Sequence, residues 1–204
     1  TKAPFDVIGD TLRGTRGIFL DMYRQPDKLL EAMDRLTPIM IKMGVGAAQT
    51  AGNPLVFMPL HKGADGFMSD EQFKKFYWPT FRKVMMGLIA EGVVPMPAAE
   101  GHWTTRLEVI QDLPKGKTLW MIDQSDIAKA KKTLGKVVCM FGNVPSDLLA
   151  VGTTQQVKDY VKNLINTCAK GGGFIVSNGA FFDQAKAENV HAVVDTTREY
   201  GVYK

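Results

Sequence analysis

The stretch KTLWMIDQSDIAKAKKTLGKVVCMFG (residues 117–142) decides the predicted fold. Two short apolar runs, KTLWMID (117–123) and KVVCMFG (136–142), enclose a lysine-rich segment of helical length. Short apolar runs rich in Val, Ile and aromatic residues predict buried strands, and a helix between two such runs predicts a parallel pair. This stretch therefore predicts one strand-helix-strand unit of an α/β fold.

The same pattern recurs on both sides of that unit. Three further apolar runs predict strands: PLVFMPL (54–60), VVPMPAA (93–99) and GFIVSNG (173–179). Segments with helical periodicity lie between the runs, so the chain predicts five βα units in succession.

Capping residues predict where two of the helices begin. Ser69 with Gln72, and Thr153 with Gln156, have the spacing of a capping box, in which each side chain bonds the backbone of the other residue. An apolar stripe ahead of the first strand predicts another helix, with a kink at Pro38 because proline lacks the backbone N–H.

Five βα units fit either an open doubly wound sheet or part of a (β/α)8 barrel. No GxGxxG motif follows a predicted strand, so a nucleotide-binding fold has no positive support. A complete barrel has eight strands and about 250 residues. We therefore predict the C-terminal portion of a TIM barrel, one domain over residues 1–204, whose opening strands lie outside this sequence.

Composition narrows the class of protein. The 204 residues are 45% hydrophobic and 23% charged, as in ordinary soluble domains. No apolar run approaches the length of a membrane span, and the net charge of +4 is spread along helices, which argues against membrane and nucleic-acid partners. Cys139 and Cys168 lie in apolar segments, so we expect free thiols and a cytoplasmic location.

Three parts of the chain carry a family likeness. They are FMSDEQFKKFYWPTFRKV (67–84), MIDQSDIAKAKKTLGKVVCMFGNV (121–144), and GGGFIVSNGA (171–180) with AENVHAVVDTTREYG (187–201). Together they resemble the uroporphyrinogen decarboxylase superfamily, which includes corrinoid-dependent methyltransferases. The middle stretch is the most specific, because Asp123, Asp126, Gly135, Gly142 and Asn143 fall at the family spacing. The resemblance implies a TIM barrel.

The resemblance also implies where a zinc site would lie. Methyltransferases of the superfamily hold zinc with three side chains, and the corresponding positions here are Ala98, Glu100 and Ala180. Alanine cannot bind zinc, and one carboxylate makes no tight site, so no zinc is expected. In the decarboxylase branch a histidine commonly occupies the position of Ala180, and that branch's arginine-rich motif and essential aspartate would lie upstream of residue 1.

Polar residues follow the predicted strands, at the barrel edge where such enzymes do chemistry. The candidate catalytic residues are His61, Glu100, His102 and Asp123, and the candidate substrate-binding residues are Lys62, Arg106, Asn143, Asn178 and Asp183. If the extended conformation persists past residue 99, Glu100 and His102 face the same way and can relay a proton.

Structural roles compete with these functional ones. Glu100 can accept hydrogen bonds at the start of the next helix, and Asp123 can cap the segment that follows it. His61 and His102 can be simple loop or surface residues, and strand-end Asn143 and Asn178 can fix turns. Lys62 and Arg106 suit a substrate carboxylate or phosphate, but surface charge is commoner.

Three functions remain open from the sequence. The first is methyl transfer from a small methylated substrate to a corrinoid co-substrate, without a zinc-thiol site and with Glu100 or His102 protonating the leaving group. The second is decarboxylation of uroporphyrinogen III, and the third is a non-catalytic barrel that binds a ligand. We expect no tightly bound cofactor, with a corrinoid protein and a second copy of the chain as candidate partners.

Overall fold

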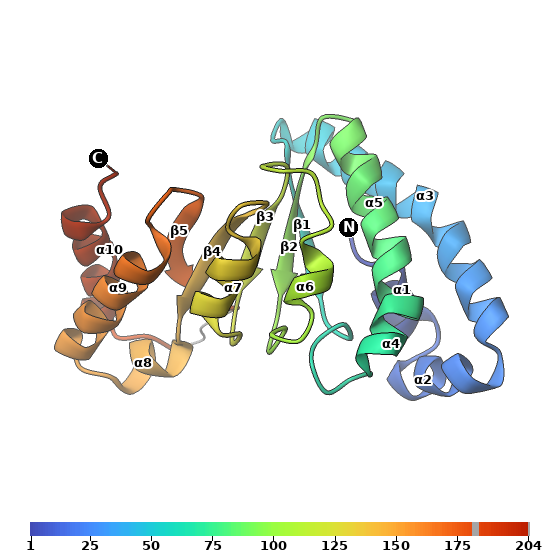
Figure 1. The fold of residues 1–204 in the computed structure, drawn as a ribbon, viewed down its shortest axis with the longest axis horizontal. Helices are drawn as coiled ribbons and strands as arrows, with labels where there is room; N and C mark the ends of the chain where they lie inside the picture. Colours follow the sequence, from blue (N-terminus) through green and yellow to red (C-terminus); the bar gives the residue numbers. More distant parts are fainter. Residues whose placement is uncertain (181–183, 204) are drawn as a thin grey trace.

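Five parallel strands form the centre of the computed structural model, which describes residues 1–180 and 184–203 (Figure 1). The strands are β1 (Leu55–Leu60), β2 (Val94–Ala99), β3 (Leu119–Ile122), β4 (Cys139–Val144) and β5 (Phe174–Asn178). They lie in the order β1-β2-β3-β4-β5, and every neighbouring pair is parallel. Strands alternate with helices along the chain, which confirms the predicted α/β fold.

Helices connect the strands and precede the first of them. Ahead of β1 lie α1 (Pro4–Val7), the π-helical segment η1 (Ile8–Leu12), α2 (Thr15–Arg24) and α3 (Pro26–Ala51). Between β1 and β3 lie α4 (Asp70–Gln72), the π-helical segment η2 (Phe73–Tyr77), α5 (Trp78–Ala90) and α6 (Leu107–Ile110). The remaining helices are α7 (Ile127–Leu134), α8 (Ser146–Val151), α9 (Thr154–Cys168) and α10 (Ala187–Tyr200).

Both predicted capping boxes form. The Gln72 backbone N–H donates to Ser69 Oγ over 3.1 Å, and the Ser69 N–H donates to Gln72 Oε1 over 3.0 Å. The Gln156 N–H likewise donates to Thr153 Oγ1 over 3.3 Å, and the Thr153 N–H to Gln156 Oε1 over 2.8 Å. Helix α3 continues through Pro38 from residue 26 to residue 51.

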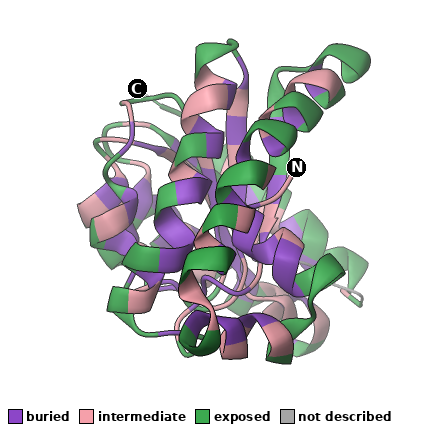
Figure 2. Ribbon diagram, turned by 90° about the vertical axis from the view of Figure 1, so that its right-hand side faces the viewer, coloured by how far each residue is buried: buried purple, intermediate pink, exposed green. Residues whose placement is uncertain are grey.

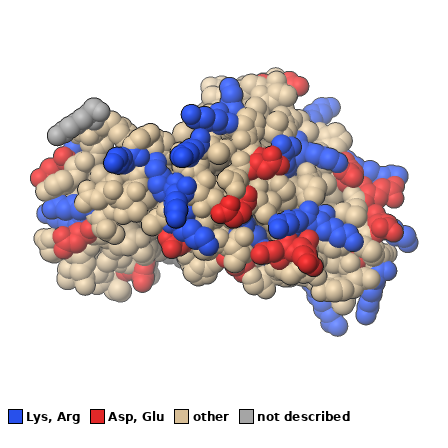
Figure 3. All heavy atoms as spheres, in the orientation of Figure 1, with Lys and Arg blue, Asp and Glu red and all other residues tan. Residues whose placement is uncertain are grey.

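The helices pack on one face of the sheet. Helices α3 and α5 pack against each other and contact β1 and β2 respectively, while α9 contacts β4, β5 and α10. Buried and exposed residues alternate along the helices that face the viewer in Figure 2, and the buried residues of α3 and α5 include Met33, Met40, Phe81 and Leu88. Basic and acidic side chains are interspersed on the face shown in Figure 3. None of the helices in the described ranges combines the length and apolar character that crossing a bilayer requires.

The other face of the sheet is apolar and partly open. On β1, Val56, Met58 and Leu60 are buried, whereas Leu55 and Phe57 on the opposite face are 41% and 40% exposed. On β5, Ile175 is 54% exposed. Successive strand residues point to opposite faces, so these exposed side chains belong to the face that would line the interior of a closed barrel.

Candidate functional site

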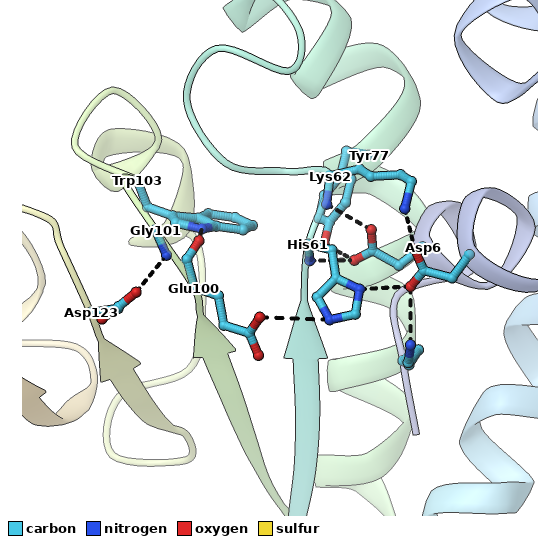
Figure 4. Close-up of polar contacts among 10 residues, drawn as sticks. Asp6, His61, Lys62, Tyr77, Glu100, Gly101, Trp103 and Asp123 are labelled. Carbon is cyan, nitrogen blue, oxygen red and sulfur yellow. Dashed lines mark hydrogen bonds and ion pairs between the residues drawn. The ribbon is translucent and has the colours of Figure 1, made fainter. Parts of the chain in front are cut away.

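The C-terminal ends of β1, β2 and β3 bring together charged residues that are far apart in the sequence. His61 and Lys62 follow β1, Glu100 follows β2, and Asp123 follows β3. The first helical turns of the chain, α1 and η1, add two carboxylates to this group, Asp6 and Asp10. Figure 4 shows His61 between Glu100 and this N-terminal segment.

Asp6 fixes the turn that follows β1. Its side chain is fully buried and accepts hydrogen bonds from the backbone N–H of His61 (3.2 Å) and of Lys62 (2.8 Å), and from the Tyr77 hydroxyl (2.5 Å). Burial raises the pKa of Asp6, although these three donors oppose the rise. Asp6 thereby joins α1, the end of β1 and η2 at a single buried carboxylate.

Asp10 lies one helical turn beyond Asp6 and receives three cationic or polar donors. Lys62 Nζ and Lys2 Nζ both donate to it, Lys2 over 3.0 Å, and His61 Nδ1 lies 2.7 Å from its Oδ2. Burial alone would raise the pKa of Asp10, but the hydrogen bonds from Lys62, Lys2 and His61 lower it to about 2. Asp10 is therefore an anion at neutral pH.

Because Gly9 has no side chain, the Lys62 side chain has room to pass residue 9 and reach Asp10. A Cβ atom at residue 9 would lie 2.6 Å from Cδ and 2.7 Å from Cε of Lys62. Lys62 is 5% exposed, so its methylene chain is buried while its ammonium group pairs with a carboxylate. This arrangement satisfies a buried charge that would otherwise be costly.

His61 connects Asp10 to Glu100. Its Nδ1 contacts Asp10, and its Nε2 lies 3.7 Å from Glu100 Oε2. The side chains of His61 and Glu100 are 35% and 26% exposed, so both are accessible to a small molecule. Burial raises the pKa of Glu100; the nearby His61 opposes this rise, and the charges of Asp123 and Asp6 add to it. A carboxyl group with a raised pKa beside an imidazole can give and regain a proton.

Glu100 and His102 do not form the pair that a continued strand would produce. Strand β2 ends at Ala99, and Gly101 has φ +75°, a conformation that glycine adopts without strain and other residues rarely adopt. The chain therefore turns between the two residues. His102 is exposed and lines a cavity beside Asp123, while Glu100 faces His61.

Asp123, which follows β3, connects the segments that follow β2 and β5. Its Oδ2 accepts the Gly101 N–H over 2.8 Å, and its Oδ1 accepts the Ala180 N–H over 2.9 Å. Gly179 is required for this contact, because a Cβ there would lie 2.3 Å from Asp123 Oδ1. Asp123 thus holds the loop that carries Glu100, a positioning role different from capping its own segment.

Asn143, in β4, is buried and stabilises the C-terminal edge of the sheet next to Asp123. Its Nδ2 donates to the Asp123 carbonyl over 3.0 Å, and the Tyr160 hydroxyl lies 3.0 Å from the Asn143 carbonyl oxygen. Asn178 Nδ2 donates to the Gly179 carbonyl over 3.2 Å, and Asn178 lines a small separate cavity with apolar residues. Asp183 lies outside the described residues.

Arg106 lies in the packed interior. It is 2% exposed, donates to the carbonyls of Gly63 (3.2 Å) and Met68 (2.5 Å), pairs with Asp70, and lies over the Phe73 ring at 4.8 Å. Its guanidinium therefore joins the loop after β1 to η2. These contacts occupy the donors that a substrate anion would need.

The residues at the superfamily's zinc positions do not fit zinc. Ala98 is fully buried in β2, Ala180 contributes its backbone N–H to Asp123, and neither has a ligating side chain. Within residues 1–180 and 184–203, no three His, Cys, Asp or Glu side chains are grouped as a metal site. Cys168 is buried, and Cys139 is half-buried.

Sequence reasoning missed Asp6, Asp10 and Tyr77. Asp6 and Asp10 are four residues apart, a spacing that places two carboxylates on the same side of a helix, and this was the available signal. Apart from Lys2, which is near Asp10 in the sequence, their partners are 51 to 71 residues away, so local periodicity gives no indication of those contacts.

Comparison with known proteins assigns the family. The family model described as Uroporphyrinogen decarboxylase (URO-D) matches residues 1–200. The chain belongs to the uroporphyrinogen decarboxylase family. A solved structure of a methyltransferase from Methanosarcina mazei superposes with a TM-score of 0.80 at 19% sequence identity. No curated protein matches the chain in sequence.

The superposition covers 98% of this uroporphyrinogen decarboxylase family chain and 58% of the methyltransferase chain. The chain thus spans less than two thirds of that structure's length. At this identity the likeness establishes the fold, and five parallel strands within it correspond to part of a TIM barrel.

Proposed function

We propose that this chain belongs to an enzyme that transfers a methyl group from a small methylated donor to a reduced corrinoid co-substrate. The observation that carries the proposal is the Asp10, His61 and Glu100 chain at the C-terminal edge of the sheet. The similar solved structure, a methyltransferase, supports it. These residues lie at the barrel edge at which TIM-barrel enzymes do chemistry.

The reaction needs a proton for the leaving group. When reduced cobalt attacks the methyl carbon, the bond from that carbon to its heteroatom breaks, and the electron pair stays on the heteroatom. Protonation makes an ether oxygen a better leaving group. Glu100 is the proposed acid because it lies at the strand edge beside His61, and burial raises its pKa, which favours the protonated form relative to an exposed carboxyl; His61 is placed to return a proton to it.

The lack of zinc-ligating side chains at Ala98 and Ala180 is compatible with this reaction. Zinc serves to activate a thiol, and methyl transfer to a corrinoid needs no thiol in this step. Uroporphyrinogen decarboxylation is less well supported, because its substrate carries several carboxylates and Asp10, Glu100 and Asp123 place negative charge at the same edge. A non-catalytic ligand-binding barrel would assign no role to the contact between His61 and Glu100.

Anaerobic visible spectroscopy tests the proposal. Full-length protein is mixed with cob(I)alamin and pooled methoxylated aromatics or methylamines, and formation of methylcobalamin is followed by its distinct absorption. We expect methyl transfer with the wild-type protein, and a loss of about 10²- to 10⁴-fold in rate for Glu100→Gln, which keeps the shape but removes the acid.

The matched control is Glu91→Gln. Glu91 is exposed and lies just before β2, at the opposite end of the strand from Glu100. Its substitution is expected to leave the rate unchanged. Absence of methylcobalamin across the donor pool would overturn the proposal. An unchanged rate for Glu100→Gln would show that Glu100 is not the acid.

A further inference from the structure

A cavity of about 910 Å³ lies at the ends of β3 and β4. His102, Asp123, Asp126, Asn143, Asp147 and Tyr160 are among the residues that line it. Its volume is within the range of small-molecule sites. None of the three residues of the proposed proton chain, Asp10, His61 and Glu100, lines this cavity.

The cavity adjoins Glu100 through Asp123. The Asp123 carboxylate lines the cavity and accepts the N–H of Gly101, the residue that follows Glu100. Asp123 also lies close enough for its charge to influence Glu100. Glu100 itself does not line the cavity, so a molecule bound there reaches the acid only by extending past Asp123.

The charges on the cavity wall have one sign. Three acidic residues, Asp123, Asp126 and Asp147, line the cavity, and its described lining contains no lysine or arginine. The backbone holds all three in place. Asp126 Oδ1 accepts the Lys129 N–H over 2.9 Å, and Asp147 Oδ1 accepts the Leu148 N–H over 2.9 Å. Fixed carboxylates accept hydrogen bonds from hydroxyl groups and repel anions.

The remaining wall suits a flat, hydroxylated molecule. Tyr160 provides an aromatic ring, Ile127 and Pro145 provide apolar surface, and Ser125 and Thr104 provide hydroxyl groups. A polar wall with a few apolar surfaces binds a ligand that has both a ring and hydrogen-bond donors.

We propose that this cavity binds the body of an uncharged, hydroxylated methyl ether and excludes methyl donors that carry a carboxylate. The inference rests on the proposed function and names its substrate class. In the reaction the methyl carbon bonds to the reduced cobalt of the corrinoid, which is oxidised by two electrons. The carbon-oxygen bond breaks, and the oxygen takes the proton of Glu100 to give an alcohol or phenol.

An ether fits this site better than a methylammonium ion does. A quaternary or protonated amine leaves as a neutral amine and needs no acid, so it would make no use of Glu100 and His61. An ether oxygen leaves well only when it is protonated. The cavity and the acid next to it thus favour the same class of donor.

Isothermal titration calorimetry without corrinoid tests the cavity separately from the reaction. The probes are vanillyl alcohol and vanillate, two methoxyphenols that differ only in a hydroxymethyl or a carboxylate group. We expect vanillyl alcohol to bind full-length protein at least about 10-fold more tightly than vanillate near neutral pH, because the three carboxylates repel the anion. The double variant Asp126→Asn with Asp147→Asn is expected to reduce that preference to about 2-fold by tightening the binding of vanillate.

Asp195→Asn is the matched control, since Asp195 is exposed on α10 and does not line the cavity, and it should keep the wild-type preference. Equal or tighter binding of vanillate, or no binding of either probe, would overturn the inference. A preference unchanged in the double variant would do the same. If vanillyl alcohol binds as expected but no methylcobalamin forms in the spectroscopic assay, the cavity stands as a binding site and the proposed reaction fails.

Discussion

The two halves of the C-terminal edge are built differently. At the ends of β1 and β2, Asp6, Asp10, His61, Lys62 and Glu100 contact one another through side chains or hold each other's backbone. At the ends of β3 and β4, carboxylates are held by backbone N–H groups and surround an open cavity.

Under the proposed function, this difference separates proton chemistry from substrate binding. Side-chain hydrogen bonds from Lys62, Lys2 and His61 lower the pKa of Asp10, whereas burial raises the pKa of Glu100 against the opposing charge of His61. Backbone-held groups around open space keep their acceptors directed at a ligand. The contrast teaches that one edge of a half-barrel can group charged side chains in one half and leave an open cavity in the other.

The largest expected effect on stability is at the ends of β1 and β2. Asp6→Ala removes a fully buried carboxylate and leaves the N–H of His61, the N–H of Lys62 and the Tyr77 hydroxyl without their acceptor. We expect the free energy of unfolding to fall by about 3 kcal/mol, because hydrogen bonds to a buried charged group are strong and lost acceptors leave unpaired donors. Urea unfolding measures the change.

Asp112→Ala is the control for that substitution. Asp112 is exposed and forms a surface ion pair with Arg82, so its loss should cost less than about 1 kcal/mol. Similar costs for the two variants would contradict the idea that Asp6 organises the β1 end.

An intermediate effect on stability is expected at Gly179, which lies against Asp123. Gly179→Ala places a Cβ atom 2.3 Å from Asp123 Oδ1, which cannot retreat without giving up the Ala180 or Gly101 N–H. Overpacking of this kind should lower the free energy of unfolding by about 2 kcal/mol. The same assay applied to Gly46→Ala should give the opposite sign. Residue 46 lies within α3, nothing lies within 4 Å of its added Cβ, and alanine favours a helix by up to about 1 kcal/mol. Destabilisation by both variants would indicate that the space around Asp123 is not the cause.

The smallest effect concerns the pH dependence of stability. The pKa of Asp10 is lowered from 3.8 to about 2, so the folded state favours the ionised form more than the unfolded state does. Its contribution to the free energy of unfolding is present above about pH 4 and is lost as the pH falls toward 2. Asp10→Asn should therefore be less stable than wild type at neutral pH, and the difference should shrink between about pH 4 and pH 2. Urea unfolding at a series of pH values measures it, and a difference that does not change with pH would rule out this role for Asp10.

Sequence patterns predicted the sheet because each strand has its own local signal. The apolar runs at 54–60 and 93–99 became β1 and β2 within one residue at each end, and the capping box at Ser69 marked the start of α4. β4 was displaced by two to three residues, to Cys139–Val144, since an apolar run does not specify where ladder pairing begins. The helix predicted after Ser69 contains the π-helical segment η2 ahead of Pro79, where the proline nitrogen cannot donate.

The site was less accessible to sequence reasoning. Glu100 and His61 were identified because they follow strands, but their mutual contact depends on the turn at Gly101 and on the approach of α1. Arg106 follows a strand too, yet Asp70 and two carbonyls hold it inside the protein. Such pairings are set by tertiary packing, which no local spacing records.

The double contact of Asp123 has a thermodynamic consequence. One carboxylate holds the amide beside Glu100 and the amide of Ala180, so a ligand that hydrogen-bonds to Asp123 competes with, or reinforces, both at once. Occupancy of the cavity and the proton affinity of Glu100 are then linked quantities. By reciprocity, whatever a cavity ligand does to the proton affinity of the acid, protonation of the acid does to the affinity of that ligand.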